Sequence, residues 1–248
     1  VPGIGPKIAA SIRSVDGASV EKRLTVWRRE GVRLVDWRSP AYPAPLHALD
    51  DAPALLFVRG SSIPCEHTAS TVDLSHCLGV AIVGTRSPTP GSRAAAYHMA
   101  RALARNGNLI ISGLALGVDG AAHRGALAAD GPTVAVLGGG VLRIYPHEHR
   151  MLADHMRVRG GLISEVAPDD NPRPTMLVAR NRIISGLSRA LVVIETAVDG
   201  GAMHAARRAH EQGRPVYVLD TPAPGNRALI SEIGAQPITP DEMSPLLP

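Results

Sequence analysis

The feature that most constrains the fold is a regular alternation of short apolar runs with helix-like segments, which begins at Gly79. The apolar runs are rich in β-branched residues, which favours buried strands. We expect strands at 80–83, 109–112, 133–137, 161–164, 191–195 and 216–219, and helices near 92–106, 119–129, 148–159, 178–188, 201–212 and 226–233. Apolar strands separated by helices predict a parallel sheet covered on both faces. The fold class is therefore α/β, with a doubly wound, mostly parallel, Rossmann-like sheet.

The part of the chain before this alternation has a different pattern. Its first residues, Val-Pro-Gly-Ile-Gly-Pro-Lys, look like the second half of a helix-hairpin-helix, as in SAM-like domains. A helix is expected at 20–30, a short strand at 31–36, and proline-punctuated extended segments and turns after it. We expect three parts: a small N-terminal helical region with its linker (1–75), a Rossmann-like domain (76–240) and a C-terminal tail (241–248).

Composition excludes several classes of protein. The longest apolar runs are far shorter than the roughly 20 residues of a membrane span, and no signal-peptide pattern is present. Cys65 and Cys77 are too few for a disulfide framework and lack companions at metal-ligand spacing. We expect a soluble, cytoplasmic protein with reduced thiols, no metal, no cofactor and no membrane partner.

Positive charge is unevenly distributed. The formal net charge is +4, and no acidic residue lies between Asp73 and Asp119 or between Asp170 and Glu195. These two segments hold eight arginines: Arg86, Arg93, Arg101, Arg105, Arg173, Arg180, Arg182 and Arg189. If the two segments meet on one face of the domain, that face suits a polyanion.

Glycine-rich turns follow three of the expected strands. They are Gly84-Thr-Arg86, Ser112-Gly-Leu-Ala-Leu-Gly117 and Gly138-Gly-Gly140, the last followed by Tyr145-Pro146. In open α/β sheets, ligands bind outside the carboxyl ends of the strands. We expect backbone N–H groups at these turns to face outward, and Arg86 to add a planar charged fork, in a groove for more than one phosphate.

With these motifs in the same order, together with Arg-Asn-Arg-Ile-Ile-Ser-Gly-Leu-Ser from Arg180, the sequence closely resembles the DNA-processing protein A (DprA, also Smf) family over about residues 40–238. The resemblance implies a non-catalytic protein that binds and shields single-stranded DNA in natural transformation and helps to load the RecA recombinase. It also implies dimers formed through the C-terminal end. Carried over by position, the DNA-binding residues would be Gly84, Thr85, Arg86, Ser112, Gly113, Gly117, Gly138, Gly139, Arg180, Asn181 and Arg182.

The chain departs from the family pattern just before the Arg-Asn-Arg motif. Family members usually place Phe-Pro there, and this chain has Leu177 and Val178. We therefore expect a base-stacking aromatic to be missing at that place. Because Arg180 and Arg182 lie two residues apart near a helix start, we expect one in the groove and the other holding the loop.

Two other functions remain open from the sequence. One is an enzyme of a related Rossmann group that cleaves nucleoside monophosphates, but here no acid follows the stretch Asp199-Gly-Gly-Ala-Met-His204 until Glu211. Glu195 could take the catalytic place, although it serves as easily to cap a helix or orient a loop. The other is a non-catalytic nucleotide sensor with the same pocket.

Several single residues have simpler interpretations. His123 and His204 have no neighbour at ligand spacing and are expected to lie on a helix surface or to pack against a loop. Asp119 is expected to be a helix N-cap. At the C-terminus, Ile238, Met243, Leu246 and Leu247 lie in a segment that looks too short to bury them alone, and we expect self-association to cover them.

Overall fold

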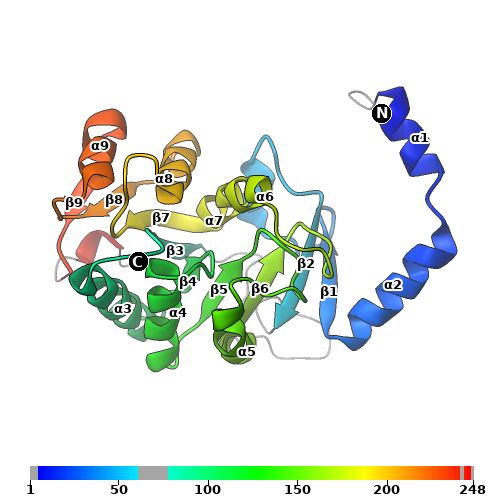
Figure 1. Cartoon of the computed structure of the whole chain (residues 1–248), viewed down its shortest axis with the longest axis horizontal. Helices are drawn as coiled ribbons and strands as arrows, with labels where there is room; N and C mark the ends of the chain where they lie inside the picture. The colour runs from blue at the N-terminus through cyan, green and yellow to red at the C-terminus, as the bar shows by residue number, and fades with distance from the viewer. Residues whose placement is uncertain (1–4, 61–77, 241–242, 247–248) are drawn as a thin grey trace.

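A computed structural model describes residues 5–60, 78–240 and 243–246 (Figure 1). The expected link at 61–75, Cys65, Cys77, Leu247 and part of the C-terminal tail lie outside the described residues. The described chain builds a nine-stranded sheet in the order β1-β2-β6-β5-β4-β3-β7-β8-β9. The expected α/β, mostly parallel, Rossmann-like sheet is confirmed.

Seven strands pair in parallel, and two more join the sheet through antiparallel pairs. The parallel strands are β3 (Gly79–Val83), β4 (Ile110–Ser112), β5 (Thr133–Val136), β6 (Gly160–Ser164), β7 (Ser188–Val193), β8 (Val216–Leu219) and β9 (Gln236–Ile238). The antiparallel strands are β1 (Val32–Asp36) and β2 (Leu55–Gly60), and β2 pairs with β6. The six strands expected from the apolar runs are all present, whereas β9 was not expected.

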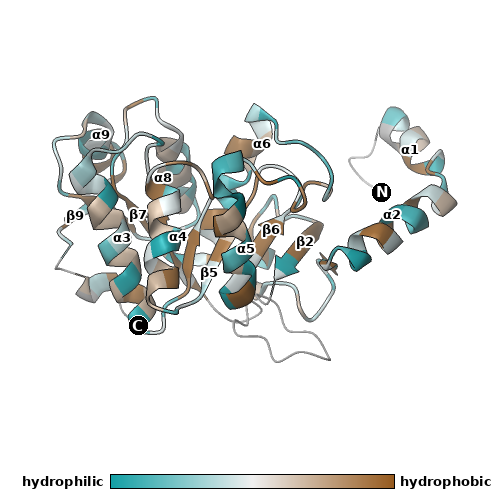
Figure 2. Cartoon of the chain, turned by 60° about the horizontal axis from the view of Figure 1, so that its bottom comes forward, coloured by the Kyte–Doolittle hydropathy of each residue, from teal (hydrophilic) through white to brown (hydrophobic). Residues whose placement is uncertain are grey.

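Alternate residues along the central strand pack on opposite faces of the sheet. Ala81 and Val83 of β3 belong to the core beneath α7 (Asn181–Gly186), α8 (Gly201–Glu211) and α9 (Pro224–Ile233). Val80 and Ile82 belong to the core beneath α3 (Pro90–Arg105) and α4 (Val118–Ala128). Figure 1 shows these helices as two layers with the sheet between them, and Figure 2 shows apolar strands behind helices with polar outer faces. Burial on both faces accounts for the nearly unbroken apolar strands.

A third core lies under α5 (Arg150–Arg159) and joins the N-terminal region to the sheet. Trp27 of α2 (Gly17–Arg29) packs edge-on against Phe57 of β2, with ring centroids 5.4 Å apart. Arg23 stacks over the Trp27 ring and pairs with Asp169 at 2.8 Å. Beyond this contact, α2 and α1 (Pro6–Arg13) extend away from the sheet as an arm (Figure 1). The strands before the linker, β1 and β2, thus belong to the same sheet as the strands after it. The division of the chain at residue 75 stays a proposal.

The expected helix at 178–188 forms two short helices instead. These are α6 (Pro174–Ala179) and α7, which meet at Arg180. The remaining expected helices are present with ends shifted by a few residues, and short 3₁₀ turns occur at Ala44–Ala48, His147–His149 and Ser244–Leu246. None of the helices described is long and apolar enough to cross a bilayer.

The C-terminal segment packs against its own sheet. Ile238 is 4% exposed, Leu246 is fully buried, and Met243 packs against the core under α3. Arg189 holds this end by donating to the Leu246 carbonyl and to the Asn108 side chain. The expectation that Ile238, Met243 and Leu246 need a second copy to bury them was therefore wrong, because β9 adds an edge strand that brings them onto the core.

Candidate functional site

The order of the strands places a crevice at the centre of the sheet. From β3 the chain builds β4, β5 and β6 on one side, then returns to place β7 on the other side of β3. The loops after β3 and β7 therefore diverge, and a cleft of about 540 Å³ opens between them. We call this the switch-point cleft. Its walls include Gly84, Thr85, Arg86, Tyr145, Leu177, Val178, Arg180, Asn181, Thr196, Gly200 and Gly201.

The turn after β3 is held by backbone contacts. A side chain at Gly84 would meet the Val118 side chain at 2.6 Å and the Glu195 carbonyl at 3.0 Å. The Thr85 amide donates to the Glu195 carbonyl at 2.7 Å, and the Thr85 carbonyl accepts from the Val118 amide. The expected outward-facing donor at Thr85 is therefore used inside the fold. Arg86 is exposed at the cleft and forms no ion pair with any described residue.

The turn after β4 is held by a buried carboxylate. Asp119 is 5% exposed, and its Oδ2 accepts the amides of Gly113 at 3.1 Å and Ala115 at 3.3 Å. The N-cap of α4 is Gly117, so the expected capping role of Asp119 was wrong. Gly117 has φ of +77°, and a Cβ there would meet the Thr85 carbonyl oxygen at 2.4 Å. This glycine allows the second turn to pack against the first.

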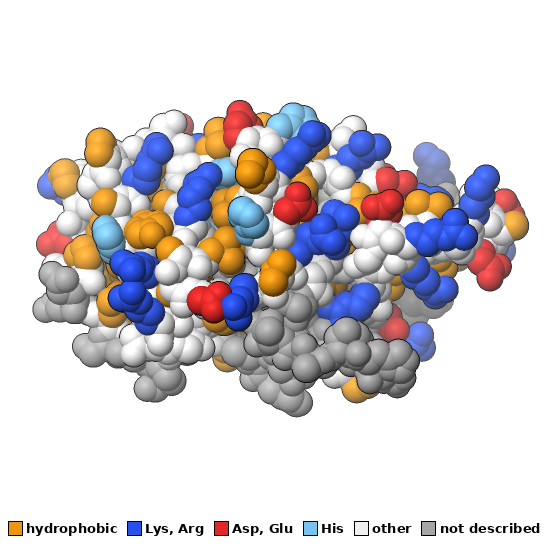
Figure 3. Space-filling model, turned by 90° about the horizontal axis from the view of Figure 1, so that it is seen from below, with side chains coloured by type: hydrophobic (Ala, Val, Ile, Leu, Met, Phe, Trp, Pro, Cys, Tyr) orange, Lys and Arg blue, Asp and Glu red, His pale blue; other side chains and the backbone are white. Residues whose placement is uncertain are grey.

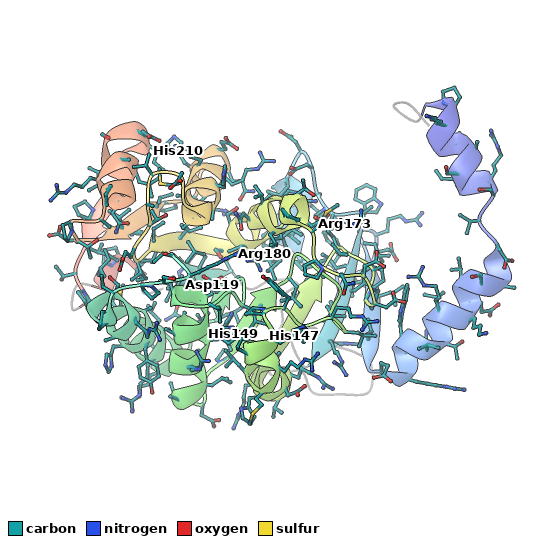
Figure 4. All side chains as sticks on the ribbon, viewed as in Figure 1. Asp119, His147, His149, Arg173, Arg180 and His210 are labelled. Carbon is teal, nitrogen blue, oxygen red and sulfur yellow. The ribbon has the colours of Figure 1, made fainter. Side chains whose placement is uncertain are left out.

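Arg180 lies across the floor of the cleft (Figure 4). Its side chain is buried and donates to the carbonyls of Gly113 and Val136, the latter at 2.6 Å. Burial lowers the pKa of Arg180, while the charge of Asp119 opposes that shift. Burial likewise raises the pKa of Asp119 against the effect of Arg180 and the two amides. The two residues therefore compensate each other's burial and fix the ends of β4 and β5.

Arg182 points elsewhere. Its guanidinium donates twice to the Glu165 carboxylate, at 2.7 and 2.6 Å, and its Nε donates to the Asp51 carbonyl at 2.9 Å. The side chain is 11% exposed and does not line the switch-point cleft. Asp51 also pairs with Arg208 of α8. Arg182 therefore joins α7 to the segment before β2, and of the two arginines Arg180 alone lies at the cleft.

Asn181 connects two walls of the cleft. It is 7% exposed, and its side-chain amide lies 3.5 Å from the Gly201 carbonyl at the start of α8. The sequence did not single out Gly200 and Gly201 as part of the binding site, although two glycines before a helix are a signal for a close backbone approach. Because the positive end of α8 opens at this wall, it favours an anion in the cleft.

The other expected site residues lie behind the cleft walls. Ser112 is fully buried and donates to the Ile82 carbonyl at 2.6 Å. A Cβ at Gly138 would meet the Leu177 backbone at 2.8 Å, and one at Gly139 would meet Pro172 at 2.9 Å. These two glycines let α6 and the loop before it pass closely over the end of β5. Gly113 lies at a small side cavity next to the main cleft.

Tyr145 was quoted in a motif but not expected to serve the site. Tyr145 is 48% exposed and lines the cleft together with Leu177 and Val178. Tyr145 therefore supplies this cleft with an aromatic side chain from the loop after β5. Its signal in the sequence was the Tyr-Pro pair that follows the third glycine-rich turn.

Glu195 and His123 have structural partners. The Glu195 carboxylate accepts from the Thr89 amide at 3.0 Å and the Thr89 hydroxyl at 2.9 Å, so it orients the loop before α3 as one interpretation predicted. His123 is fully buried, and its Nδ1 lies 2.7 Å from the Thr133 hydroxyl, which itself donates to Ile110. His123 thus packs in the core. No cluster of three or more metal-ligating side chains occurs among the described residues.

A family comparison accounts for this arrangement. The family model for DNA recombination-mediator protein A matches residues 33–245. The chain belongs to the DNA recombination-mediator protein A family. It is 37% identical over 196 residues to the DNA processing protein DprA of Bacillus subtilis and 36% identical over 221 residues to the protein Smf of Escherichia coli. These matches cover 79% and 89% of this chain, but only 63% and 56% of the relatives.

Solved structures of the family have the same fold. DprA from Streptococcus pneumoniae superposes with a TM-score of 0.85 at 28% identity, over 100% of this chain and 84% of that one. DprA from Helicobacter pylori gives a TM-score of 0.73 at 30% identity, over 84% of this chain and 90% of that one. The latter structure is described as showing a single-stranded DNA binding mode. The resemblance inferred from the motifs is confirmed.

Proposed function

We propose that this protein binds single-stranded DNA in the switch-point cleft, with little preference for sequence. The observation that carries the proposal is the exposed Arg86 at the mouth of a cleft whose own buried charges, Asp119 and Arg180, bond to the backbone and offset each other's burial. Because the floor is fixed, the positive charge available to bind a phosphate comes from Arg86 and from the start of α8. Tyr145, Leu177 and Val178 offer flat or apolar surface for bases. The described binding of single-stranded DNA by the Helicobacter pylori relative supports this choice.

The residues of the site divide by position. We assign contact with DNA to Gly84, Thr85, Arg86, Arg180 and Asn181, which line the cleft. We assign Ser112, Gly113, Gly117, Gly138 and Gly139 to shaping the turns behind it. Arg182 holds the segment around Asp51 in place and supports the cleft from behind.

A binding function fits the cleft better than hydrolysis of nucleotides. Asp119 is the only carboxylate residue among the lining residues described, and it already accepts two amides. Glu195 lines a separate cavity between the starts of α3 and α9. A general acid or base must reach the reacting atoms. We therefore propose that the protein has no catalytic activity, and incubation with nucleoside monophosphates should release no free base.

The wider role follows the family. We propose that the protein protects incoming single-stranded DNA in the cytoplasm during natural transformation and helps to load RecA, and that it works as a homodimer. Family membership supports these assignments. Sedimentation at micromolar concentration tests the dimer, and a monomer there contradicts it.

A titration with ligands of increasing length tests the binding function. The protein should bind a long oligonucleotide more tightly than a mononucleotide, and log affinity should fall linearly with log salt because arginines replace counterions. A nucleotide sensor would instead prefer the mononucleotide. Absence of binding to a long oligonucleotide at low salt contradicts the proposal.

A further inference from the structure

A second cavity adjoins the switch-point cleft on the side of β2 and α5. Its volume is about 490 Å³, close to that of the first. It lies between the loop after β5, the start of α5 and the loop before α6. We call it the α5 cleft and define it by Arg59, Arg143, Tyr145, His147, Arg150 and Asn171. None of the residues expected to bind DNA lies in it.

Tyr145 joins the two cavities. Its exposed ring lines the switch-point cleft, the α5 cleft and the small cavity between them that also contains Arg86 and Gly113. In Figure 4, His147 lies on the α5 side of Arg180, and Arg173 lies toward β2. The three cavities therefore meet at Tyr145.

The α5 cleft carries excess positive charge. Three arginines and a histidine line it against one acid, Asp154, which pairs with Arg157 at 3.3 Å. Neither His147 nor Arg150 forms an ion pair within the described part of the chain. Arg143 is positioned by a hydrogen bond from Nε to the Asp169 carbonyl at 3.1 Å. Figure 3 shows the face seen from below Figure 1, where blue arginine and lysine side chains cover more of the surface than red acidic ones.

Crowding of cations supports the same interpretation. Burial lowers the pKa of Arg59, and the charge of Arg157 lowers it further, while Glu30 and Asp154 act in the opposite direction. Like charges held together in a cavity gain from a bound polyanion, which releases counterions as it binds. A single strand offers phosphates along one edge and bases that can stack on an exposed ring.

We propose that single-stranded DNA bound in the switch-point cleft continues across Tyr145 into the α5 cleft, where Arg143, His147 and Arg150 bind its next phosphates. Tyr145 stacks with a base at the crossing. This inference rests on the proposed function, since it extends the path of the same ligand. It assigns a second subsite to residues outside the glycine-rich turns and the Arg-Asn-Arg motif.

Oligonucleotide length separates the two subsites. An oligonucleotide of about 4 nucleotides should fill the first cleft, and one of about 16 nucleotides should also reach the second. Single-stranded-DNA-binding OB folds cover about 4 to 16 nucleotides each. In Arg143→Ala and Arg150→Ala, the long oligonucleotide should bind more weakly, with a salt slope reduced by about 1, while the short one binds as before. Tyr145→Ala should lower the affinity for the long oligonucleotide about tenfold, and Tyr145→Phe should keep the wild-type affinity.

Arg105→Ala is the matched control, because Arg105 is exposed at the far end of α3, away from both cavities. Unchanged circular dichroism would show that each variant is folded. Wild-type protein that binds the long oligonucleotide while the Arg143, Arg150 and Arg105 variants all bind it equally well would overturn the second subsite and leave the proposed function standing. Equal loss for short and long oligonucleotides would also overturn it. Failure of the wild type to bind either one would overturn both proposals.

Discussion

The two arginines of the Arg180-Asn181-Arg182 motif serve two different regions of the molecule. The cleft floor around Arg180 is buried and holds the turns after β4 and β5, next to an open cavity. The junction around Arg182 ties Glu165 and Asp51 together and borders no such cavity. Both regions depend on one arginine, yet only the first can affect a ligand directly. The comparison shows that a motif can combine a binding surface with the joint that supports it.

The largest effect is expected from Arg180→Ala. Removing this side chain leaves Asp119 buried without its cation, which costs about 3–5 kcal/mol. In a chain of this length, the melting temperature should fall by about 10 °C, measured by circular dichroism. Replacing both residues, with Arg180→Met and Asp119→Asn, should recover part of the loss. A thermal midpoint that does not change would show that the floor does not depend on the pair.

Arg182→Ala should have a smaller effect on stability. The Arg182–Glu165 pair is partly accessible, with side-chain exposures of 11% and 24%, so its loss should cost about 2 kcal/mol. The melting temperature should fall by about 6 °C. At temperatures where the variant is folded, its affinity for single-stranded DNA should equal that of the wild type. A loss of affinity without a loss of stability would reverse the division between the two arginines.

Acid should destabilise the fold through the buried His123 of α4. Burial lowers the pKa of His123 to about 3, and the charges of His149 and Arg180 act in the same direction. Because the folded protein keeps this ring neutral, its contribution is complete above pH 6.5 and declines as the pH falls from there toward 3. The titration of this group should lower the free energy of unfolding by about 2 kcal/mol at pH 5. The unfolding free energy of His123→Gln should depend less steeply on pH than that of the wild type, and equal slopes would contradict the assignment.

Local patterns predicted the fold better than they predicted the site. The central strands could be read from apolar runs because both faces of the sheet are covered. The pairing of β2 with β6 depends on contacts between segments about 100 residues apart, such as Phe57 with Ser164, which no local pattern reports. The same holds for β9. It is only three residues long, and it is a strand because it pairs with β8.

The chemistry at the site was harder to assign than its position. The glycine-rich turns correctly marked the carboxyl edge, but not which amides were free, since Asp119 takes two of them and Glu195 takes another. The direction of Arg182 depends on Asp51, which is distant in the sequence. Tyr145 and Leu177 are distant in the sequence, and only the folded chain brings both into the lining of one cleft.

We propose that DNA binds at the mouth of the switch-point cleft, where Arg86 lies, and not at the junction around Arg182. The most direct test is a salt titration of a long single-stranded oligonucleotide with wild type, Arg86→Ala and Arg182→Ala. Arg86→Ala should keep its melting temperature, bind all sequences more weakly and lower the slope of log affinity against log salt by about 1. Arg182→Ala should keep the wild-type slope. Equal slopes for wild type and Arg86→Ala, or a reduced slope for Arg182→Ala alone, would contradict the account.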